Sequence, residues 1–369
     1  MRRPLGSLLL AVFCALTLAA GPVAAAQNSP LASGALFPEI ALPTPVDPAR
    51  RAYLGLGDQP TFRLSEVDAE VVLFELLSVY CPHCQMQAPS YNELYRMIEA
   101  DPATRGRIKL LGIGVASQWE EIDRFTSGFQ VPFPILPDPE FAVWRAVGGT
   151  ATPLSLYIRQ RHPEQPGIVA ATHLGLNTHY RELFAELKSL ASTEPDTLRK
   201  KPAQSQKSHP AIRQILTPEE LESRVRRAFI ASADRIVDLS PVALPSGRDV
   251  FRALVETGGN RQSLFAEVVS RTSICDICHD VHFIYLFTPE GEVVGFLPLQ
   301  LTKYGNVDWN EAEVATMRRR LLGRSLASPR PFSAKVDAIT SATMTSAIIF
   351  DSLAQGPALL TELAAKGLR

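Results

Sequence analysis

Two short cysteine motifs are the residues of this chain with the clearest capacity for chemistry. Cys81 and Cys84 are separated by two residues, and so are Cys275 and Cys278. The fifth cysteine, Cys14, lies in an apolar N-terminal segment. A disulfide that closes such a short loop adds little stability, because it removes almost no chain entropy from the unfolded state. We therefore interpret both pairs as redox or ligand-binding sites rather than structural cross-links.

The first motif has the sequence CPHC. It follows an apolar stretch at residues 71–74 and precedes a helical stretch that extends to about residue 99. This placement puts Cys81 at a helix N-terminus, where backbone N–H groups and the helix dipole favour the thiolate. We expect Cys81 to be the exposed nucleophile, Cys84 the buried resolving thiol, and His83 a positive charge that lowers the pKa of Cys81. Zinc needs a second ligand pair, and none follows in this half of the chain.

The second motif has the sequence CDICH, and it admits three interpretations. The pattern is that of c-type haem attachment, in which His279 would be the axial ligand. Zinc could bind through Cys275, Cys278, His279 and His282, although four ligands so close in sequence strain a tetrahedral site. A redox dithiol needs only the two thiols. We place the dithiol first, because the residues that follow the motif form an apolar, strand-like run.

The N-terminus indicates an exported protein. Residues 1–3 form a basic head, residues 8–20 are an apolar run, and residues 24–26 are alanines that suit signal-peptide cleavage. The apolar run is shorter than the roughly 20 residues that span a bilayer. We predict a signal peptide at residues 1–26 and a mature protein that is periplasmic or otherwise exported, and soluble after cleavage. In such a compartment cysteines are usually oxidised.

Length and charge restrict the function further. The chain has 369 residues, which predicts two domains. Lys and Arg total 37 and Asp and Glu total 38, so no basic excess is present to bind phosphates, and we expect no nucleic-acid partner. A polar run at residues 194–209 interrupts the apolar pattern. We predict domains at residues 27–193 and 216–369, joined by a linker at residues 194–215.

The two halves differ in their pattern of secondary structure. Strands and helices alternate in the first half, which predicts an α/β domain with a central sheet flanked by helices. Its expected strands cover residues 71–74, 109–115, 132–136, 154–158 and 167–173, and its later helices cover 120–129 and 180–190. The second half predicts an α+β domain. A capping box at residues 217–220 opens a helix, and residues 281–287 and 292–299 form a hairpin. Helices cover 314–322 and 347–365, the second with one Gly-Pro interruption.

The first half resembles the thioredoxin superfamily over roughly residues 36–191. Glu75 lies six residues before Cys81, Pro153 follows Thr152 in a loop after two glycines, and Pro89 interrupts the helix after the CPHC motif. The overall pattern is similar to exported TlpA-type proteins, with a DsbA-like CPHC centre. The resemblance implies a thiol–disulfide oxidoreductase that acts on protein thiols and disulfides. It implies that Glu75 is a buried acid that relays the proton of the resolving cysteine, and that Pro153 is a cis-proline facing the disulfide.

One position departs from this resemblance. Gln87 lies where the cytochrome-maturation members of the superfamily carry a glutamate. The specialised reductant role of those members is therefore not implied for this chain.

A second resemblance lies in residues 337–346, which read DAITSATMTS. The segment resembles the FMN-binding domain of the flavin subunits in sodium-pumping quinone reductase and Rnf complexes. The resemblance implies that a flavin transferase joins FMN to Thr343 through a phosphoester, with Asp337, Ser341, Ala342 and Thr345 completing the cofactor site. Ser341 departs from the glycine usual in that family. A helix N-terminus with small residues suits a phosphate, because its backbone N–H groups are unpaired.

Together these motifs predict an electron path. We expect a periplasmic thiol–disulfide oxidoreductase in which electrons pass between FMN, the Cys275–Cys278 pair and the Cys81–Cys84 pair, with the direction left open. Its expected partners are the thiols or disulfides of substrate proteins, a membrane electron donor and a flavin transferase. The alternative is a flavin-carrying electron-transfer component of a membrane reductase system, with c-type haem at Cys275 and Cys278.

Overall fold

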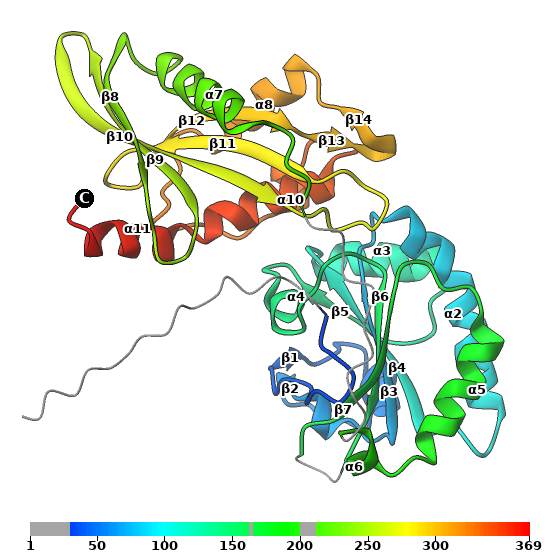
Figure 1. Ribbon diagram of the computed structural model, residues 1–369. Helices are drawn as coiled ribbons and strands as arrows, with labels where there is room; N and C mark the ends of the chain where they lie inside the picture. Colours follow the sequence, from blue (N-terminus) through cyan, green and yellow to red (C-terminus); the bar gives the residue numbers. More distant parts are fainter. Residues whose placement is uncertain (1–29, 162–164, 200–211) are drawn as a thin grey trace, which may run out of the picture.

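The computed structural model describes residues 30–161, 165–199 and 212–369. The expected signal peptide with Cys14, and most of the expected linker, lie outside the described residues. The described chain forms two domains, one above the other in Figure 1. Within the described part, no helix combines the length and the apolar character needed to cross a bilayer.

The N-terminal domain is built on a five-stranded sheet with the order β5-β4-β3-β6-β7. Its central strand β3 runs parallel to β4, which runs parallel to β5, whereas β6 and β7 are antiparallel to their neighbours. Every residue of β3 and β4 is buried, because both strands are covered on both faces. The strands are β3 (Val71–Leu77), β4 (Ile108–Val115), β5 (Ile135–Asp138), β6 (Leu154–Arg159) and β7 (Ile168–Leu174).

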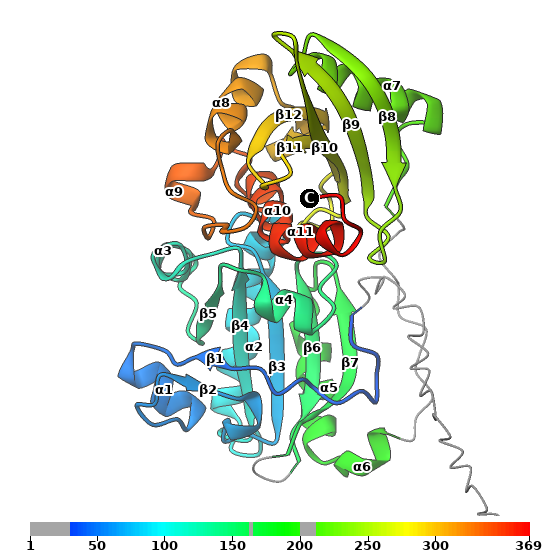
Figure 2. The same ribbon diagram turned by 90° about the vertical axis from the view of Figure 1, so that its left-hand side faces the viewer.

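Helices cover both faces of this sheet, as predicted (Figure 2). One buried cluster joins α2 (Pro82–Ala100), α3 (Trp119–Phe129) and α5 (Tyr180–Ala191) to the sheet. The other face carries the N-terminal segment and α4 (Ala142–Ala146). The N-terminal segment contains β1 (Leu42–Pro43), α1 (Pro48–Leu54), β2 (Thr61–Phe62) and the 3-10 turn η1 (Leu64–Glu66).

Two local expectations for this half change. The strand expected at residues 132–136 is β5, which begins only at Ile135, because Pro132 and Pro134 have no N–H group to donate to a neighbouring strand. A short helix, α6 (Pro195–Leu198), lies at the start of the expected linker. Proline at its first position and the buried side chain of Leu198 explain the helix in an otherwise polar run.

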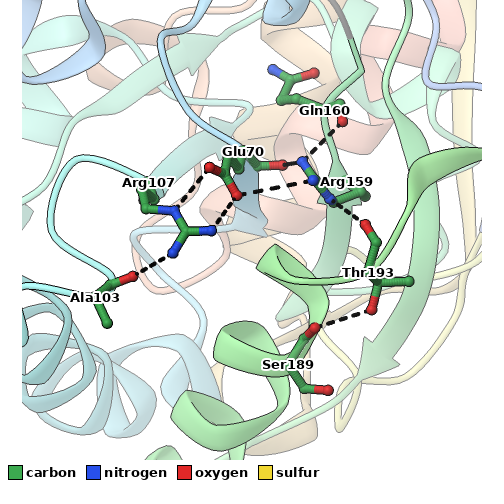
Figure 3. Close-up of polar contacts among 7 residues, drawn as sticks. All are labelled: Glu70, Ala103, Arg107, Arg159, Gln160, Ser189 and Thr193. Carbon is green, nitrogen blue, oxygen red and sulfur yellow. Dashed lines mark hydrogen bonds and ion pairs between the residues drawn. The ribbon is translucent and has the colours of Figure 1, made fainter.

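Figure 3 shows the polar contacts that hold the start of β3. Glu70 lies directly before that strand, and its carboxylate accepts from Arg107 Nε and Nη2, each at 2.8 Å. Arg159, at the end of β6, donates through Nη1 to the Glu70 carbonyl at 2.9 Å and through Nε to the Thr193 carbonyl at 2.9 Å. The CPHC motif follows the other end of β3, so this network and the thiols lie at opposite ends of the central strand.

The C-terminal domain contains a five-stranded antiparallel sheet with the order β12-β11-β10-β9-β8. One face packs against α7 (Pro218–Ile230), and the other against α8 (Glu311–Leu321), α10 (Thr343–Ala354) and α11 (Gly356–Ala365). The strands are β8 (Arg235–Val242), β9 (Asp249–Thr257), β10 (Asn260–Arg271), β11 (Val281–Phe287) and β12 (Val293–Gln300). Smaller elements are β13 (Thr302–Lys303), η2 (Tyr304–Asn306), β14 (Val307–Asp308) and α9 (Ala334–Asp337).

The predicted α+β character, the capping box of α7 and the β11–β12 hairpin are confirmed. The strands β8 to β10 were not predicted, because exposed charged residues interrupt their apolar positions. The helix expected at residues 347–365, with an interruption at Gly356-Pro357, is two helices, and the first begins at Thr343. The break falls at Gln355, because Pro357 has no N–H and begins a new helix more readily than it continues one.

The domains contact each other through charged and apolar groups. Asp351 of α10 accepts from Arg145 of α4 at 2.7 Å and from Arg271 of β10 at 3.0 Å. A single buried apolar cluster contains residues of both domains, including Trp144 and Phe350. In Figure 2, α10 and α11 lie on the side of the C-terminal domain that faces the N-terminal one.

Candidate redox site

Cys81 lies at the junction predicted from the sequence. Strand β3 ends at Leu77, a turn follows in which Cys81 N donates to the Ser78 carbonyl at 3.0 Å, and α2 begins at Pro82. Cys81 is the N-cap residue with extended backbone angles, and proline suits the first helical position. Cys84 is in the first turn of α2 and is buried, as predicted.

The Thr152–Pro153 loop faces this helix start. The peptide bond between these two residues is cis, as the family resemblance implied. The Cys81 Sγ atom is 3.5 Å from the Thr152 carbonyl oxygen, which places the loop directly beside the first sulfur.

The second cysteine motif docks on this same loop. Thr152 N donates to the Ile274 carbonyl at 2.6 Å, and Asp276 N donates to the Thr152 carbonyl at 3.2 Å. These contacts form a parallel β-bridge between Thr152 and Cys275. The bridge brings the two thiols together: the Sγ atoms of Cys81 and Cys275 lie within 4.8 Å of each other. Two CxxC motifs from different domains therefore form one site.

This docking corrects one expectation about Cys81. Its side chain was expected to be exposed, but its exposed fraction is 0%. The segment around Cys275 covers the sulfur, which a free CPHC motif would present to solvent. The expectation treated the N-terminal domain as if it stood alone.

The docking also bears on metal binding. A second cysteine pair does lie beside the first, although it comes from the other domain. Among the residues that the structure describes, only one set of three metal-ligand atoms lies within 4.8 Å of one another, and it belongs to Cys81, Cys275 and Asp276. Four thiolates around one zinc ion would need all their sulfurs equally close. The sulfur contacts instead run in sequence from Cys84 to Cys81, Cys275 and Cys278.

The four thiols have alternating acidity along this series. Hydrogen bonds from Cys275 and Cys84 lower the pKa of Cys81, and a hydrogen bond from Cys275 lowers the pKa of Cys278. Burial and the neighbouring Cys81 raise the pKa of Cys84. Contacts with Cys278 and Cys81, together with burial, raise the pKa of Cys275. This pattern favours thiolates at Cys81 and Cys278, and protonated thiols at the other two positions.

His83 makes a different contact from the one expected. Its Nδ1 atom lies 2.8 Å from Asp276 Oδ2, across the domain boundary. The interactions that lower the pKa of Cys81 come from the thiols of Cys275 and Cys84, from the backbone and from Thr152. The effect of His83 on that thiol stays a prediction. Asp276 was not predicted as a site residue, because only the folded chain brings it to the CPHC motif.

Glu75 is buried beneath the thiols. Burial raises the pKa of its carboxyl group to about 8, and Gln87 Nε2 donates to Glu75 Oε1 at 2.7 Å. Glu75 is also one of the charges that raise the pKa of Cys84. The acid is therefore placed where the thioredoxin resemblance puts a proton relay, and the unusual Gln87 is its hydrogen-bond partner.

A cavity of about 350 Å³ adjoins the second cysteine pair. It is lined by Cys278 together with Ser341, Ala342, Thr343 and Thr345, four of the five residues predicted to bind a cofactor. Pockets for cofactors commonly have volumes from about 300 to 1,000 Å³. Other lining residues include Tyr80, Lys303 and Tyr304.

The residues of this cavity fit a flavin phosphate. Thr343 is the first residue of α10, and the preceding Ala342 offers no side-chain cap, so the helix leaves backbone N–H groups for an anion. Ser341 has a φ of 61°, a left-handed conformation that glycine adopts at lower cost. The turn therefore holds a left-handed backbone with serine at residue 341.

Asp337 was predicted to bind the cofactor, but it does not line the cavity. It is fully buried, and its carboxylate pairs with Arg324 at 3.1 Å and Arg330 at 2.7 Å and accepts from Ser333 N at 3.0 Å. Its contacts fix the segment that precedes the turn at Ser341 and Ala342. Thr345, in contrast, donates through its hydroxyl to the Thr302 carbonyl at 2.7 Å at the cavity wall.

The two histidines that follow the second cysteine pair contact other groups. His279 is exposed, and its backbone N–H donates to Asn306 Oδ1 at 2.9 Å. His282 is buried in β11, with Nδ1 2.9 Å from Ser270 Oγ. Among the described residues, these histidines do not gather with Cys275 and Cys278 into a ligand set. The haem alternative stays a prediction that none of these contacts tests.

Comparisons with known proteins give matches among solved structures alone. No family model matches this chain, and no curated protein matches it. A structure described as a thiol:disulfide interchange protein DsbE from Chlorobium tepidum is 19% identical, over 44% of this chain and 99% of that chain, with a TM-score of 0.34. A secreted thiol-disulfide isomerase from Corynebacterium glutamicum is 20% identical, over 42% and 86% of the two chains, with a TM-score of 0.33. StoA from Bacillus subtilis is 15% identical, over 43% and 98%, with a TM-score of 0.30.

The class of the N-terminal domain follows from its own topology. A mixed sheet with β3 at its centre leads into a CxxC motif at the start of α2, and the loop before β6 presents a cis-proline to that motif. This combination defines a thioredoxin-like domain. The C-terminal domain carries the partner dithiol.

Proposed function

We propose that this protein is an exported thiol–disulfide oxidoreductase whose two CxxC pairs exchange electrons with each other. One observation carries the proposal: the Thr152–Cys275 bridge holds the Cys275 Sγ atom within 4.8 Å of the Cys81 Sγ atom. Thiol–disulfide exchange needs a thiolate in contact with a disulfide sulfur, and this contact supplies that pairing within one chain.

The exchange proceeds in two steps when the second pair is the oxidised one. The Cys81 thiolate attacks Cys275 of the Cys275–Cys278 disulfide, and Cys278 leaves as a thiolate. Cys84 then loses its proton to the Glu75 carboxylate and attacks Cys81, and Cys275 leaves. The Cys81–Cys84 pair is oxidised by two electrons and the Cys275–Cys278 pair is reduced by two. The same steps in reverse carry electrons the other way.

We propose that FMN is bound as a phosphoester at Thr343. Support comes from the shared cavity: Thr343 and Cys278 line the same space, so the cofactor and the second dithiol would be neighbours. The turn at Ser341 and Ala342 would hold the phosphate group, and Tyr80 and Tyr304 offer aromatic surfaces for a ring system. Bound FMN supplies one- and two-electron chemistry, whereas a disulfide exchanges two electrons.

The proposed partners follow from the same sites. Substrate proteins would exchange disulfides with the CPHC motif, a flavin transferase would attach the cofactor, and a membrane component would donate electrons. The proposed periplasmic location depends on the basic and apolar pattern of residues 1–26.

Trapping tests the exchange. The double variant Cys84→Ser/Cys278→Ser keeps Cys81 and Cys275, which should form an intramolecular disulfide under mild oxidation. The matched variant Cys81→Ser/Cys275→Ser keeps the two outer thiols, which should stay reduced. Intact mass and peptide mapping without reductant locate the bond. If the first variant forms no such disulfide while it is folded, the proposed exchange is wrong.

A further inference from the structure

Asp276 is the carboxylate nearest to the two reacting sulfurs. One of its oxygens lies within 4.8 Å of both Cys81 Sγ and Cys275 Sγ. Its Oδ2 atom pairs with His83 Nδ1 at 2.8 Å, which fixes the orientation of the side chain. Its Oδ1 atom is buried and, among the described residues, has no hydrogen-bond partner.

The exchange creates a need for such a group. Cys275 is 1% exposed, so solvent has little access to it. Its thiol must lose a proton when it attacks the Cys81–Cys84 disulfide, and it must regain one when it leaves the mixed disulfide. Glu75 lies on the Cys84 side of the series and serves that thiol. No equivalent acid has been assigned to Cys275.

The groups that face Asp276 come from both domains. His83 of α2, Cys81, and Cys275 and Cys278 of its own loop surround it. Burial raises the pKa of Asp276, and His83 lowers it. A Cys81 thiolate beside the carboxylate also raises the pKa of Asp276, so the negative charges on the two groups disfavour each other. A proton held on Asp276 would relieve that repulsion.

We propose that Asp276 accepts the proton of Cys275 and returns it during exchange between the two pairs. This inference rests on the proposed function. In one direction Cys275–SH gives its proton to the Asp276 carboxylate, and the thiolate attacks Cys81, with Cys84 as the leaving thiolate. In the other direction Cys275 leaves the mixed disulfide as a thiolate and takes the proton from the Asp276 carboxyl group. A small side-chain shift or one bridging water closes the separation.

The test follows exchange within the full chain. The reduced protein is mixed with one equivalent of diamide and quenched with acid at intervals, and peptide mass spectrometry locates the disulfides. The measured quantity is the rate at which the disulfide that forms first equilibrates between the Cys81–Cys84 and Cys275–Cys278 pairs. It is measured from about pH 5 to about pH 9, a range that brackets the titration of carboxyl and thiol groups. The variants are Asp276→Asn and Asp276→Glu. Asp280→Asn is the matched control, since Asp280 lies in the same segment and accepts only from Arg213 N among the described residues.

Asp276→Asn should slow exchange at least about tenfold at neutral pH, because general acid–base groups contribute about 10²–10⁴ to rates. The deficit should shrink as pH rises, since hydroxide then removes the Cys275 proton. Asp276→Glu should recover part of the rate, and Asp280→Asn should exchange at the parent rate. A parent rate in Asp276→Asn, or slowing by the same factor at every pH, would overturn the inference.

The double variant used for trapping distinguishes this inference from the proposed function. Asp276→Asn is added to Cys84→Ser/Cys278→Ser, and the yield of the Cys81–Cys275 disulfide is compared with its parent. An equal yield of this disulfide with and without Asp276→Asn shows that the two thiols still come into contact. Slow exchange in Asp276→Asn then results from impaired proton transfer. If the triple variant no longer forms the Cys81–Cys275 disulfide, Asp276 is needed for docking alone, and its role in proton transfer is overturned. The disulfide trapped in the parent double variant would still support the proposed exchange.

Discussion

Thr152 and Cys275 form a β-bridge in which the Thr152 backbone contacts both neighbours of the cysteine. Its N–H donates to the Ile274 carbonyl at 2.6 Å, and its carbonyl accepts from Asp276 N at 3.2 Å. The loop beside the first CxxC motif therefore holds the segment around Cys275 of the same chain. An outside protein that approaches Cys81 must displace this segment, because the sulfur is fully covered.

Access to Cys81 should therefore depend on domain docking. Asp351 has a side chain that is 5% exposed, and it joins Arg145 of the N-terminal domain to Arg271. Asp351→Asn should weaken docking by about 1–3 kcal/mol, since a buried charged contact is lost. At about 1.4 kcal/mol per tenfold change, alkylation of Cys81 should accelerate about five- to hundredfold. Timed alkylation with peptide mass spectrometry measures the rate.

The control for this experiment is Asp238→Asn, because Asp238 is exposed on the edge strand β8, away from α10. It should leave alkylation unchanged. Equal rates in Asp351→Asn and the parent would show that domain separation does not limit the reactivity of Cys81.

Glu75 should make stability depend on pH. Its folded pKa of about 8 exceeds the ordinary value of 4.5, because burial penalises the carboxylate. The folded state therefore binds more protons than the unfolded state between these values, and its stability falls as pH rises through this window. At 1.36 kcal/mol per pKa unit, the loss amounts to roughly 5 kcal/mol above pH 8.

Glu75→Gln should remove this dependence. Under reducing conditions, urea unfolding of the parent and the variant should give similar midpoints near pH 4 and a higher midpoint for the variant near pH 9. Glu66→Gln is a control, because Glu66 is exposed and caps the turn η1. Parallel curves for the parent and Glu75→Gln across the whole range would contradict the raised pKa.

The sequence was sufficient to predict the features that depend on one domain. The burial of Glu75 and the cis bond before Pro153 were expected only from the resemblance to the thioredoxin superfamily. The strand before Cys81 and the helix after it belong to a continuous segment whose apolar pattern is strong. Local spacing is informative there, because each residue is placed by the strand or helix next to it in the chain.

The contact between the two cysteine pairs was not predictable in the same way. It depends on how two separately folded domains dock, and neither motif contains a signal for the other. For this reason Cys81 was expected to be exposed, and the role of Asp276 was missed. The strands β8 to β10 were missed for a local reason, since charged residues such as Arg252 and Glu256 interrupt their apolar positions.

Flavin attachment should depend on Thr343 and tolerate glycine at residue 341. Thr343→Ala removes the hydroxyl that would form the phosphoester, so protein produced with a flavin transferase should lack the added mass of FMN. Ser341→Gly should keep the added mass, and it should raise stability by up to about 1 kcal/mol, because the residue has a φ of 61°. Intact mass and thermal unfolding measure the two effects.

Thr361→Ala is the control, because Thr361 is an exposed threonine of α11 outside the cavity lining, and its hydroxyl donates to the Pro357 carbonyl. It should retain attachment. FMN on Thr343→Ala, or its absence from the parent when a competent transferase is present, would contradict the assignment of Thr343.

Asp337 should contribute to the stability of the fold rather than to cofactor binding. Its carboxylate is fully buried between Arg324 and Arg330, so Asp337→Asn leaves two guanidinium groups without their counter-charge. Breaking a buried ion pair typically costs about 3–5 kcal/mol. The variant should unfold at a clearly lower urea concentration, whereas Asp308→Asn, at an exposed position of β14, should match the parent. Flavin incorporation into Asp337→Asn should fall only in proportion to the unfolded fraction. If Asp337→Asn loses flavin incorporation while its stability is unchanged, Asp337 belongs to the cofactor site after all.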